Sequence, residues 1–153
     1  MNNIYIAYFD GACEPINPGG TATYGAVILQ AGEPIWMCSE VYQPEPGHEH
    51  ETSNNLAEYS GLIAVLDWFA ERGLFDAEIM VYGDSQLVIN QVFGTWRIKK
   101  GLYVPLAHRA RELVQAFDHI HGQWIPRGEN ALADRLSKAA LKRVGVELRL
   151  QPI

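Results

Sequence analysis

Basic side chains are almost absent from the first ninety residues. Residues 1–90 hold thirteen Asp and Glu but only one cation, Arg72, whereas residues 91–153 hold eleven Lys and Arg and five Asp and Glu. The two parts carry formal charges of −12 and +6, so the chain carries −6. The total argues against a nucleic-acid partner, but the uneven distribution predicts a cation-binding cluster followed by an anion-binding face. Two solvated surfaces that differ by chance are the alternative.

Cysteines and long apolar runs are also scarce. The two cysteines, Cys13 and Cys38, are expected to be reduced thiols. The apolar runs are too short for a membrane-spanning helix, and no basic segment followed by an apolar block marks a secretory leader. We therefore expect a cytoplasmic protein without a membrane partner. The length of 153 residues fits one domain, residues 1–153, with a real core.

The apolar pattern predicts the order β-β-β-α-β-α-α-β-α, with no pattern assigned to residues 146–153. Strands are expected at residues 3–9, 21–29, 34–42, 77–83 and 119–125, and helices at 54–72, 85–93, 102–117 and 128–145. An antiparallel meander followed by βα units predicts an α/β fold, a mixed sheet with helices on both faces. Ligands of such sheets gather at the carboxyl ends of strands, where Asp10 and Asp84 are expected.

Three acidic residues stand where a negative charge has a cost. Asp10 ends an apolar strand, but Asp-Gly is also a common turn pair, and both interpretations stay open. Glu58 lies on the apolar side of its helix, where a buried carboxylate needs a partner. Exposure in the first turn, near the positive end of the helix dipole, is the alternative for Glu58. Asp84 precedes a helix and could simply be its N-cap.

A fourth acid, Asp134, is a surface residue by periodicity. It falls on the side of the last helix opposite the apolar stripe, which is Leu132, Leu136, Ala139 and Ala140. Several acids without nearby bases nevertheless indicate a shared site for a hard divalent ion, Mg²⁺ or Mn²⁺. The His-x-His pairs at 48–50 and 119–121 are spaced for neither a helical metal pair nor a zinc finger, and are interpreted as polar loop and strand residues.

Four separated motifs resemble type 1 ribonuclease H and occur in that family's order. They read "YFDGACEPINPGG", "TSNNLAEYSGLIAVL", "VYGDSQLVINQV" and "IPRGENALADRLSKAA", and the likeness spans residues 3 to about 144. The resemblance implies the ribonuclease H-like fold, a five-stranded mixed sheet whose first three strands are antiparallel, flanked by helices. It also implies the family's four metal-binding catalytic acids, which match Asp10, Glu58, Asp84 and Asp134.

The resemblance further implies an endonuclease that hydrolyses the RNA strand of RNA/DNA hybrids with two Mg²⁺ ions, Mn²⁺ being a possible substitute. The products are 5′-phosphate and 3′-hydroxyl ends, and the implied role is removal of RNA primers and R-loops in DNA replication. Amide side chains suit 2′-hydroxyls and base edges, although helix capping and turns would also explain the asparagines. By resemblance the substrate contacts are Asn17, Thr52, Ser53, Asn54, Asn55, Gln86, Trp96, Arg97, Lys99 and Lys100.

Two departures from the better-known members stand out. Residues 94–102 connect two helices directly where many bacterial members carry a basic extra helix, so weaker binding or another route to affinity is implied. The loop before the last helix is short, as in an archaeal-like branch, and holds Arg127 where other members have a longer loop with a histidine. We expect Arg127 to approach the scissile phosphate or a product, because a guanidinium binds phosphate but does not shuttle protons near neutral pH.

Other functions compete with this interpretation. A resolvase, integrase or exonuclease domain could share the fold, and only the asparagine-rich contacts favour RNA over DNA. A non-catalytic binding module would not require four carboxylates facing a polyanion. A phosphotransferase of the actin or sugar-kinase type needs phosphate loops and a second domain that this sequence does not show. The sequence favours a monomeric enzyme whose partner is an RNA/DNA hybrid.

Overall fold

A computed structural model describes residues 3–146, so most of the unassigned tail lies outside the described residues. The described strands form one five-stranded sheet in the order β3-β2-β1-β4-β5. Their bounds are β1 Ile4–Glu14, β2 Thr21–Gln30, β3 Glu33–Val41, β4 Glu78–Gly83 and β5 His119–Trp124. The first three strands are antiparallel, whereas β4 runs parallel to both β1 and β5. The predicted mixed sheet is confirmed.

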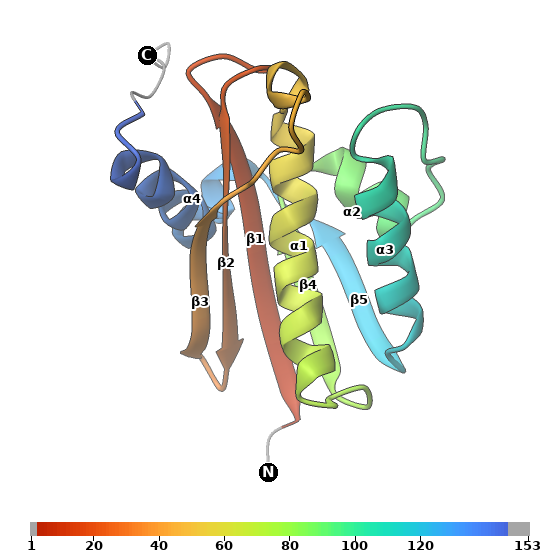
Figure 1. The fold of residues 1–153 in the computed structure, drawn as a ribbon. Helices are drawn as coiled ribbons and strands as arrows, with labels where there is room; N and C mark the ends of the chain where they lie inside the picture. Colours follow the sequence, from red (N-terminus) through yellow and green to blue (C-terminus); the bar gives the residue numbers. More distant parts are fainter. Residues whose placement is uncertain (1–2, 147–153) are drawn as a thin grey trace.

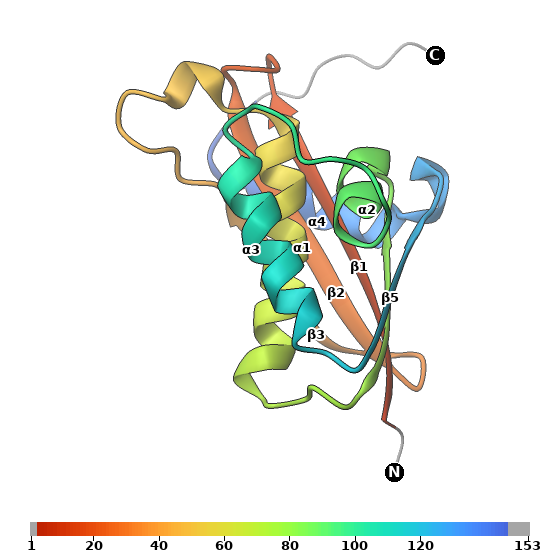
Figure 2. The ribbon, with the colours of Figure 1, turned by 90° about the vertical axis from the view of Figure 1, so that its right-hand side faces the viewer.

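Helices cover both faces of the sheet, as the sequence predicts (Figure 1). The helices α1 and α3 lie on one face, α2 packs beside α3 and β5, and α4 covers β1 to β3 from the other face (Figure 2). Their bounds are α1 Asn54–Glu71, α2 Gln86–Val92, α3 Val104–Gln115 and α4 Ala131–Arg143, with short 3-10 helices η1 Glu49–Glu51 and η2 Arg127–Glu129. No helix among residues 3–146 is both long and apolar enough to cross a membrane.

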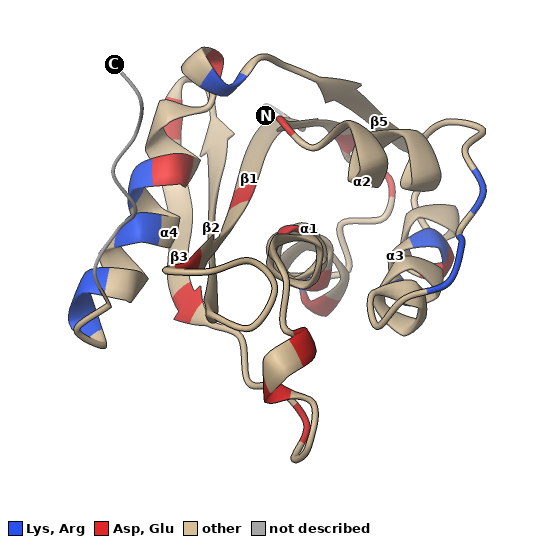
Figure 3. Cartoon of the chain, turned by 90° about the horizontal axis from the view of Figure 1, so that it is seen from above, with Lys and Arg blue, Asp and Glu red and all other residues tan. Residues whose placement is uncertain are grey.

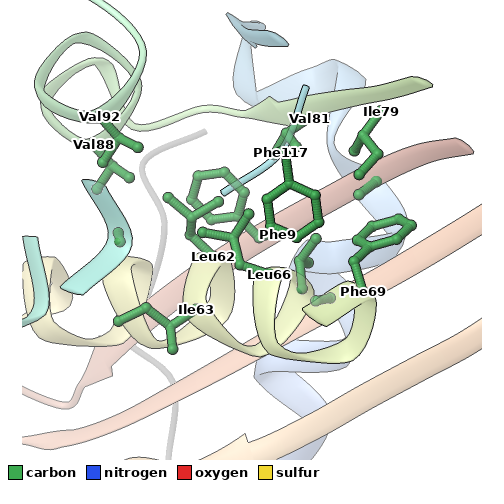
Figure 4. Close-up of a cluster of buried hydrophobic side chains, with 14 of the residues drawn as sticks. Phe9, Leu62, Ile63, Leu66, Phe69, Ile79, Val81, Val88, Val92 and Phe117 are labelled. Atoms are coloured by element: carbon green, nitrogen blue, oxygen red, sulfur yellow. The ribbon is translucent and has the colours of Figure 1, made fainter. Parts of the chain in front are cut away.

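The main core lies between α1 and the sheet (Figure 4). Alternate residues of β1 point towards α1, so Phe9 is fully buried against Leu62, Leu66 and Phe69 of the helix. Burying each such side chain contributes about 1.5–3 kcal/mol to stability. The helix ends at Glu71, with Arg72 as its C-cap, because Gly73 takes a positive φ of 66°. This packing holds the first turn of α1 against the middle of β1.

Strand β1 is longer than the expected 3–9. It continues to Glu14 because β2 keeps pairing with it, from Asp10 opposite Gly25 to Glu14 opposite Thr21. Its parallel pairing with β4 stops earlier, at Phe9 opposite Gly83. Asp10 is therefore the first residue of β1 beyond the parallel partner, and its interpretation as a turn residue is wrong.

The last helix differs from the sequence expectation in two ways. It begins at Ala131 after the 3-10 turn η2, not at residue 128, and its buried residues are Ala133, Ser137, Ala140 and Leu141. Small side chains face the sheet because α4 lies almost on the β2 backbone. A Cβ added at Gly25 would lie 2.6 Å from the amide nitrogen of Ser137. The hydroxyl of Thr23 also donates to the Ser137 carbonyl at 2.7 Å.

Candidate active site

Three carboxylates from distant parts of the chain meet where β1 and β4 stop pairing. Asp10 comes from β1, Glu58 from the first turns of α1 and Asp84 from the residue after β4, and one oxygen of each lies within 4.8 Å of the others. The close approach depends on Gly11, where an added Cβ would lie 2.4 Å from the Glu58 amide nitrogen. The structure brings together three of the four acids that the resemblance implied; their role stays a prediction.

The acid trio, Asp10, Glu58 and Asp84, is buried enough to change its protonation. Glu58 is 5% exposed, which confirms the core-facing position expected from helical periodicity. Burial, reinforced by the charges of the other two acids, raises the pKa of Glu58 well above its usual range. Burial, then the charge of Asp84, raises the pKa of Asp10 to about 8. Burial also raises the pKa of Asp84, against a hydrogen bond from Asn130 and the charge of Arg127.

The donor set of the trio fits a hard divalent cation. Among the described residues the Oε2 atom of Glu58 is buried without a hydrogen-bond partner. The three side chains offer only carboxylate oxygens, the ligands that Mg²⁺ and Mn²⁺ prefer, and each destabilises the charged form of its neighbours. A divalent cation would satisfy the unpaired oxygen and remove that repulsion at once.

Asn130 belongs to the site, although the sequence analysis did not single it out. This buried residue directly precedes α4, and its Nδ2 donates to the Phe9 carbonyl at 2.8 Å and to Asp84 Oδ2 at 3.3 Å. Asn130 thus joins β1 to the turn after β4. Its only sequence signal is a polar residue just before a helix, which by itself predicts a cap.

Asp134 lines the same cavity of about 310 Å³ as the trio but stands apart from it. Its carboxylate oxygens lie 3.1 Å from Lys138 Nζ and 4.0 Å from Arg127 Nη2. The side chain is 22% exposed, so it is on the surface as periodicity predicts but partly covered in the wall of the cavity. Asp134 follows the small residue Ala133 that faces the sheet, and this contact brings it to the cavity wall.

Two of the expected RNA contacts, Asn17 and Asn54, bind each other across the cavity mouth. Asn17 Nδ2 donates to Asn54 Oδ1 at 2.8 Å, and Asn17 Oδ1 accepts from the Asn54 amide at 3.1 Å. Asn17 therefore satisfies a free N–H at the start of α1, where the N-cap Ser53 makes no side-chain bond. Asn55 is partly exposed, whereas Thr52 is buried and does not reach the surface.

The remaining predicted contacts lie on α2 and on the connector between α2 and α3. Ser85, not Asp84, caps α2, because its side chain accepts from the Val88 amide at 3.2 Å; the N-cap interpretation of Asp84 is wrong. Gln86 is exposed at the first turn of α2. The connector, residues 93–103, contains no helix, so the extra helix is absent from residues 94–102 as expected, and α3 begins two residues later than expected. The connector exposes Trp96, Arg97, Lys99 and Lys100.

Positive charge flanks the acidic strand (Figure 3). Lys and Arg gather on α4 to one side of β1 and along the connector to the other, while β1 itself carries acid. Among the described residues the sites of these charges are Arg135, Lys138, Lys142 and Arg143 on α4 and Arg97, Lys99 and Lys100 on the connector. Two basic flanks around a carboxylate centre suit a polyanion whose reacting group meets a metal ion.

This sheet order, with carboxylates at the β1–β4 junction, defines a ribonuclease H-like domain. Comparison with known proteins agrees, because a family model described as reverse transcriptase-like matches residues 8–140. The crystal structure of RNase H1 from the halophilic archaeon Halobacterium salinarum NRC-1 superposes with a TM-score of 0.76 at 35% identity, over 92% of this chain and 98% of that one. The chain therefore belongs to the reverse transcriptase-like family and, within it, to the type 1 ribonucleases H.

Other relatives extend the comparison. The bifunctional protein Rv2228c of Mycobacterium tuberculosis is 37% identical over 125 residues, which are 82% of this chain and 32% of that protein. Ribonuclease HI of Halobacterium salinarum is 35% identical over 142 residues, 88% of this chain and 63% of that protein. The chain thus spans only part of these relatives. LC11-RNase H1, solved in complex with an RNA/DNA hybrid, has a TM-score of 0.77 at 29% identity, over 92% of this chain and 98% of that one.

Proposed function

We propose that this chain is a metal-dependent endonuclease that hydrolyses the RNA strand of RNA/DNA hybrids. The observation that carries the proposal is the acid trio of Asp10, Glu58 and Asp84, with its unpartnered Glu58 oxygen, in a chain of the type 1 ribonuclease H family. A solved relative supports the substrate, since LC11-RNase H1 was crystallised in complex with an RNA/DNA hybrid.

The acid trio would hold Mg²⁺, with Mn²⁺ as a substitute, and Asp134 would complete the site. Two such ions, when bound, would supply the Lewis acidity needed for hydrolysis to 5′-phosphate and 3′-hydroxyl ends. Asp10 and Glu58 must lose their protons to bind metal. The raised pKa values oppose this deprotonation, whereas a bound cation favours it. The hydrogen bond from Asn130 would orient Asp84 towards the cation.

The other side chains of the cavity would bind the hybrid. Arg127 places a permanent charge beside Asp134 and would bind the scissile phosphate or a released one. Asn17, Asn54, Asn55 and Gln86 would contact 2′-hydroxyls and base edges, and Ser53 a phosphate of the DNA strand. The connector would contact the DNA backbone through Trp96, Arg97, Lys99 and Lys100.

This activity suits removal of RNA primers and R-loops during DNA replication, by a monomer in the cytoplasm. A nuclease of the same fold that cleaves DNA is the second candidate, because the acid trio would serve either substrate. The paired amides of Asn17 and Asn54 at the cavity mouth favour RNA.

One assay tests the proposal. The protein is incubated with labelled RNA/DNA hybrid, duplex DNA or duplex RNA, with Mg²⁺, with Mn²⁺ or with EDTA. We expect cleavage of the RNA strand of the hybrid alone, loss of cleavage in EDTA, and loss in Asp10→Asn. Glu112→Gln, which removes an exposed acid on α3, is the matched control and should cleave like the parent. Cleavage of duplex DNA alone, or equal cleavage by Asp10→Asn, would overturn the proposal.

A further inference from the structure

A buried glutamine on α2 holds the backbone of the connector. Gln91 is 1% exposed, and all of its side-chain polar atoms have partners. Its Nε2 donates to the Arg97 carbonyl at 2.8 Å and to the Tyr103 hydroxyl at 3.3 Å. Its Oε1 accepts a hydrogen bond of 2.5 Å from the Tyr59 hydroxyl on α1. One side chain thus joins α1, α2 and the connector.

Other contacts hold the same segment from the side of α3. Arg111 donates through Nε to the Gln91 carbonyl at 2.8 Å and through Nη2 to the Trp96 carbonyl at 3.5 Å. The rings of Tyr59 and Tyr103 stack with centroids 5.8 Å apart and planes 3° from parallel. Ile98 packs against the core. Two carbonyls of the connector, those of Trp96 and Arg97, are therefore bound by side chains of α2 and α3.

Other side chains of the connector are exposed. Trp96 is 46% exposed, and Arg97, Lys99 and Lys100 are exposed as well. Tyr59 is the neighbour of Glu58 on α1, so the buried bonds tie these exposed groups to the helix that carries an acid of the trio. A segment ordered before binding loses less conformational entropy when it meets a ligand.

We propose that Gln91, together with Tyr59, is a positioning unit that fixes the connector so that its aromatic and basic side chains meet the hybrid while the trio meets the RNA. The unit contacts no substrate itself. By ordering a short segment before the hybrid binds, the unit supplies affinity. Other family members obtain this affinity from an additional basic helix. The inference rests on the proposed function.

The test compares Gln91→Met in two backgrounds. Methionine matches the length of glutamine but makes none of the three hydrogen bonds. We therefore expect KM for the hybrid to rise about tenfold with kcat within about twofold. In a variant that already lacks the three connector cations, Arg97→Ala/Lys99→Ala/Lys100→Ala, the same change should raise KM less than about twofold. An equal tenfold rise in both backgrounds would indicate a general structural effect and overturn the inference.

Two further variants protect the test against misfolding. Tyr59→Phe keeps the ring stack and removes only the hydroxyl, so it should raise KM in the same background-dependent way, by about threefold. Ser60→Ala removes another hydrogen bond of α1, from Ser60 Oγ to the Leu56 carbonyl, and should leave KM unchanged. A Tyr59→Phe variant with parental KM would contradict the proposal.

Amide hydrogen exchange separates this inference from the proposed function. Gln91→Met should speed exchange in residues 94–103 and leave β1 unchanged, whether or not the protein cleaves the hybrid. A parent without hybrid cleavage contradicts the proposed function alone. Unchanged exchange in residues 94–103 contradicts the positioning role alone.

Discussion

Glu58 is the central residue of the candidate site. Its carboxylate is placed in the protein interior by an apolar helix, beside two other acids and without a hydrogen-bond partner for Oε2 among the described residues. Such an arrangement costs stability in the metal-free protein, because buried like charges either repel or take up protons. The metal-free fold is therefore more stable when these carboxyl groups are protonated, whereas metal binding requires them to be deprotonated.

Stability of the metal-free protein should fall as pH rises from about 4 to about 8. The pKa of Asp10 is raised from 3.8 to about 8, so in this window the folded protein keeps a proton that the unfolded chain has lost. In EDTA we expect a lower Tm at pH 8 than at pH 5, and a larger rise of Tm with Mg²⁺ at pH 8.

Asp10→Asn supplies the control for this prediction. Without metal it should flatten the pH dependence and stabilise the fold at pH 8 by about 1–3 kcal/mol, because a neutral amide replaces a buried charge. Thermal melts of both proteins in EDTA decide the matter. An identical Tm for the parent at the two pH values would contradict the cost assigned to the trio.

Arg127 should matter for turnover more than for folding. Its guanidinium is exposed on η2, faces Asp134 and lowers the pKa of Asp84, so its loss removes a fixed charge from the cavity. We expect Arg127→Ala to lower kcat on the hybrid about tenfold or more with little change in Tm, and Arg127→Lys to keep part of the activity. Full turnover by Arg127→Ala would exclude a role at the phosphate.

The close packing of helix α4 on β2 positions the side chain of Asp134. It approaches β2 so closely that a Cβ at Gly25 would meet the backbone of α4, and Asp134 reaches the cavity because Ala133 and Ser137 face the sheet. The bond from Thr23 to the Ser137 carbonyl fixes the helix along its axis. The position of Asp134 is thus set by the strand beneath it.

Gly25→Ala tests this dependence. The added Cβ would meet the Ser137 amide nitrogen at 2.6 Å and the Ala133 carbonyl oxygen at 2.7 Å, both backbone atoms, so α4 must move. We expect a loss of about 1–3 kcal/mol in the free energy of unfolding and a lower kcat. Gly128→Ala, whose Cβ meets nothing within 4 Å, is the control for denaturant unfolding. Equal stability of the two variants would contradict the close contact.

The same helix shows where sequence reasoning stops. Glu58 could be placed from the sequence because α1 buries large apolar residues at regular spacing, and that periodicity reveals which side is covered. In α4 most of the expected apolar stripe is not the buried side, because Gly25 lets small residues approach β2. The buried residues of the helix are Ala133, Ser137, Ala140 and Leu141. Asn130 was missed because its partner, the Phe9 carbonyl, is 121 positions away. The pattern of apolar residues in a sequence does not predict contacts that a backbone makes.

The whole molecule separates its charges in space as well as along the chain. The acids that could hold metal lie between basic α4 and the basic connector, so the net charge of −6 hides two positive flanks. A polyanion that approaches the cavity meets these positive flanks first. The negative charge of the acid trio repels the polyanion only while the trio has no bound cation.

Binding of the hybrid should therefore depend strongly on salt. Each connector cation that contacts a phosphate releases a counterion, so Lys99→Ala should reduce the slope of log affinity against log salt by about 1, and Lys99→Ala/Lys100→Ala by about 2. Arg72→Gln is the matched control, because Arg72 stacks on Trp68 at the far end of α1. Titrations with Ca²⁺ in place of Mg²⁺ measure the slopes. If both Lys variants had the same salt slope as the parent, these lysines of the connector would not contact the phosphates of the hybrid.

Under the proposed function, the bonds between Asn17 and Asn54 would affect discrimination between RNA and DNA more than affinity. In the free protein these amides already satisfy one another, so an RNA 2′-hydroxyl would exchange one hydrogen bond for another and gain little net energy. A deoxyribose at that place could separate the pair without offering a replacement. The site would then reject DNA by leaving polar groups unpaired, and its selectivity for RNA would survive under conditions that weaken binding overall.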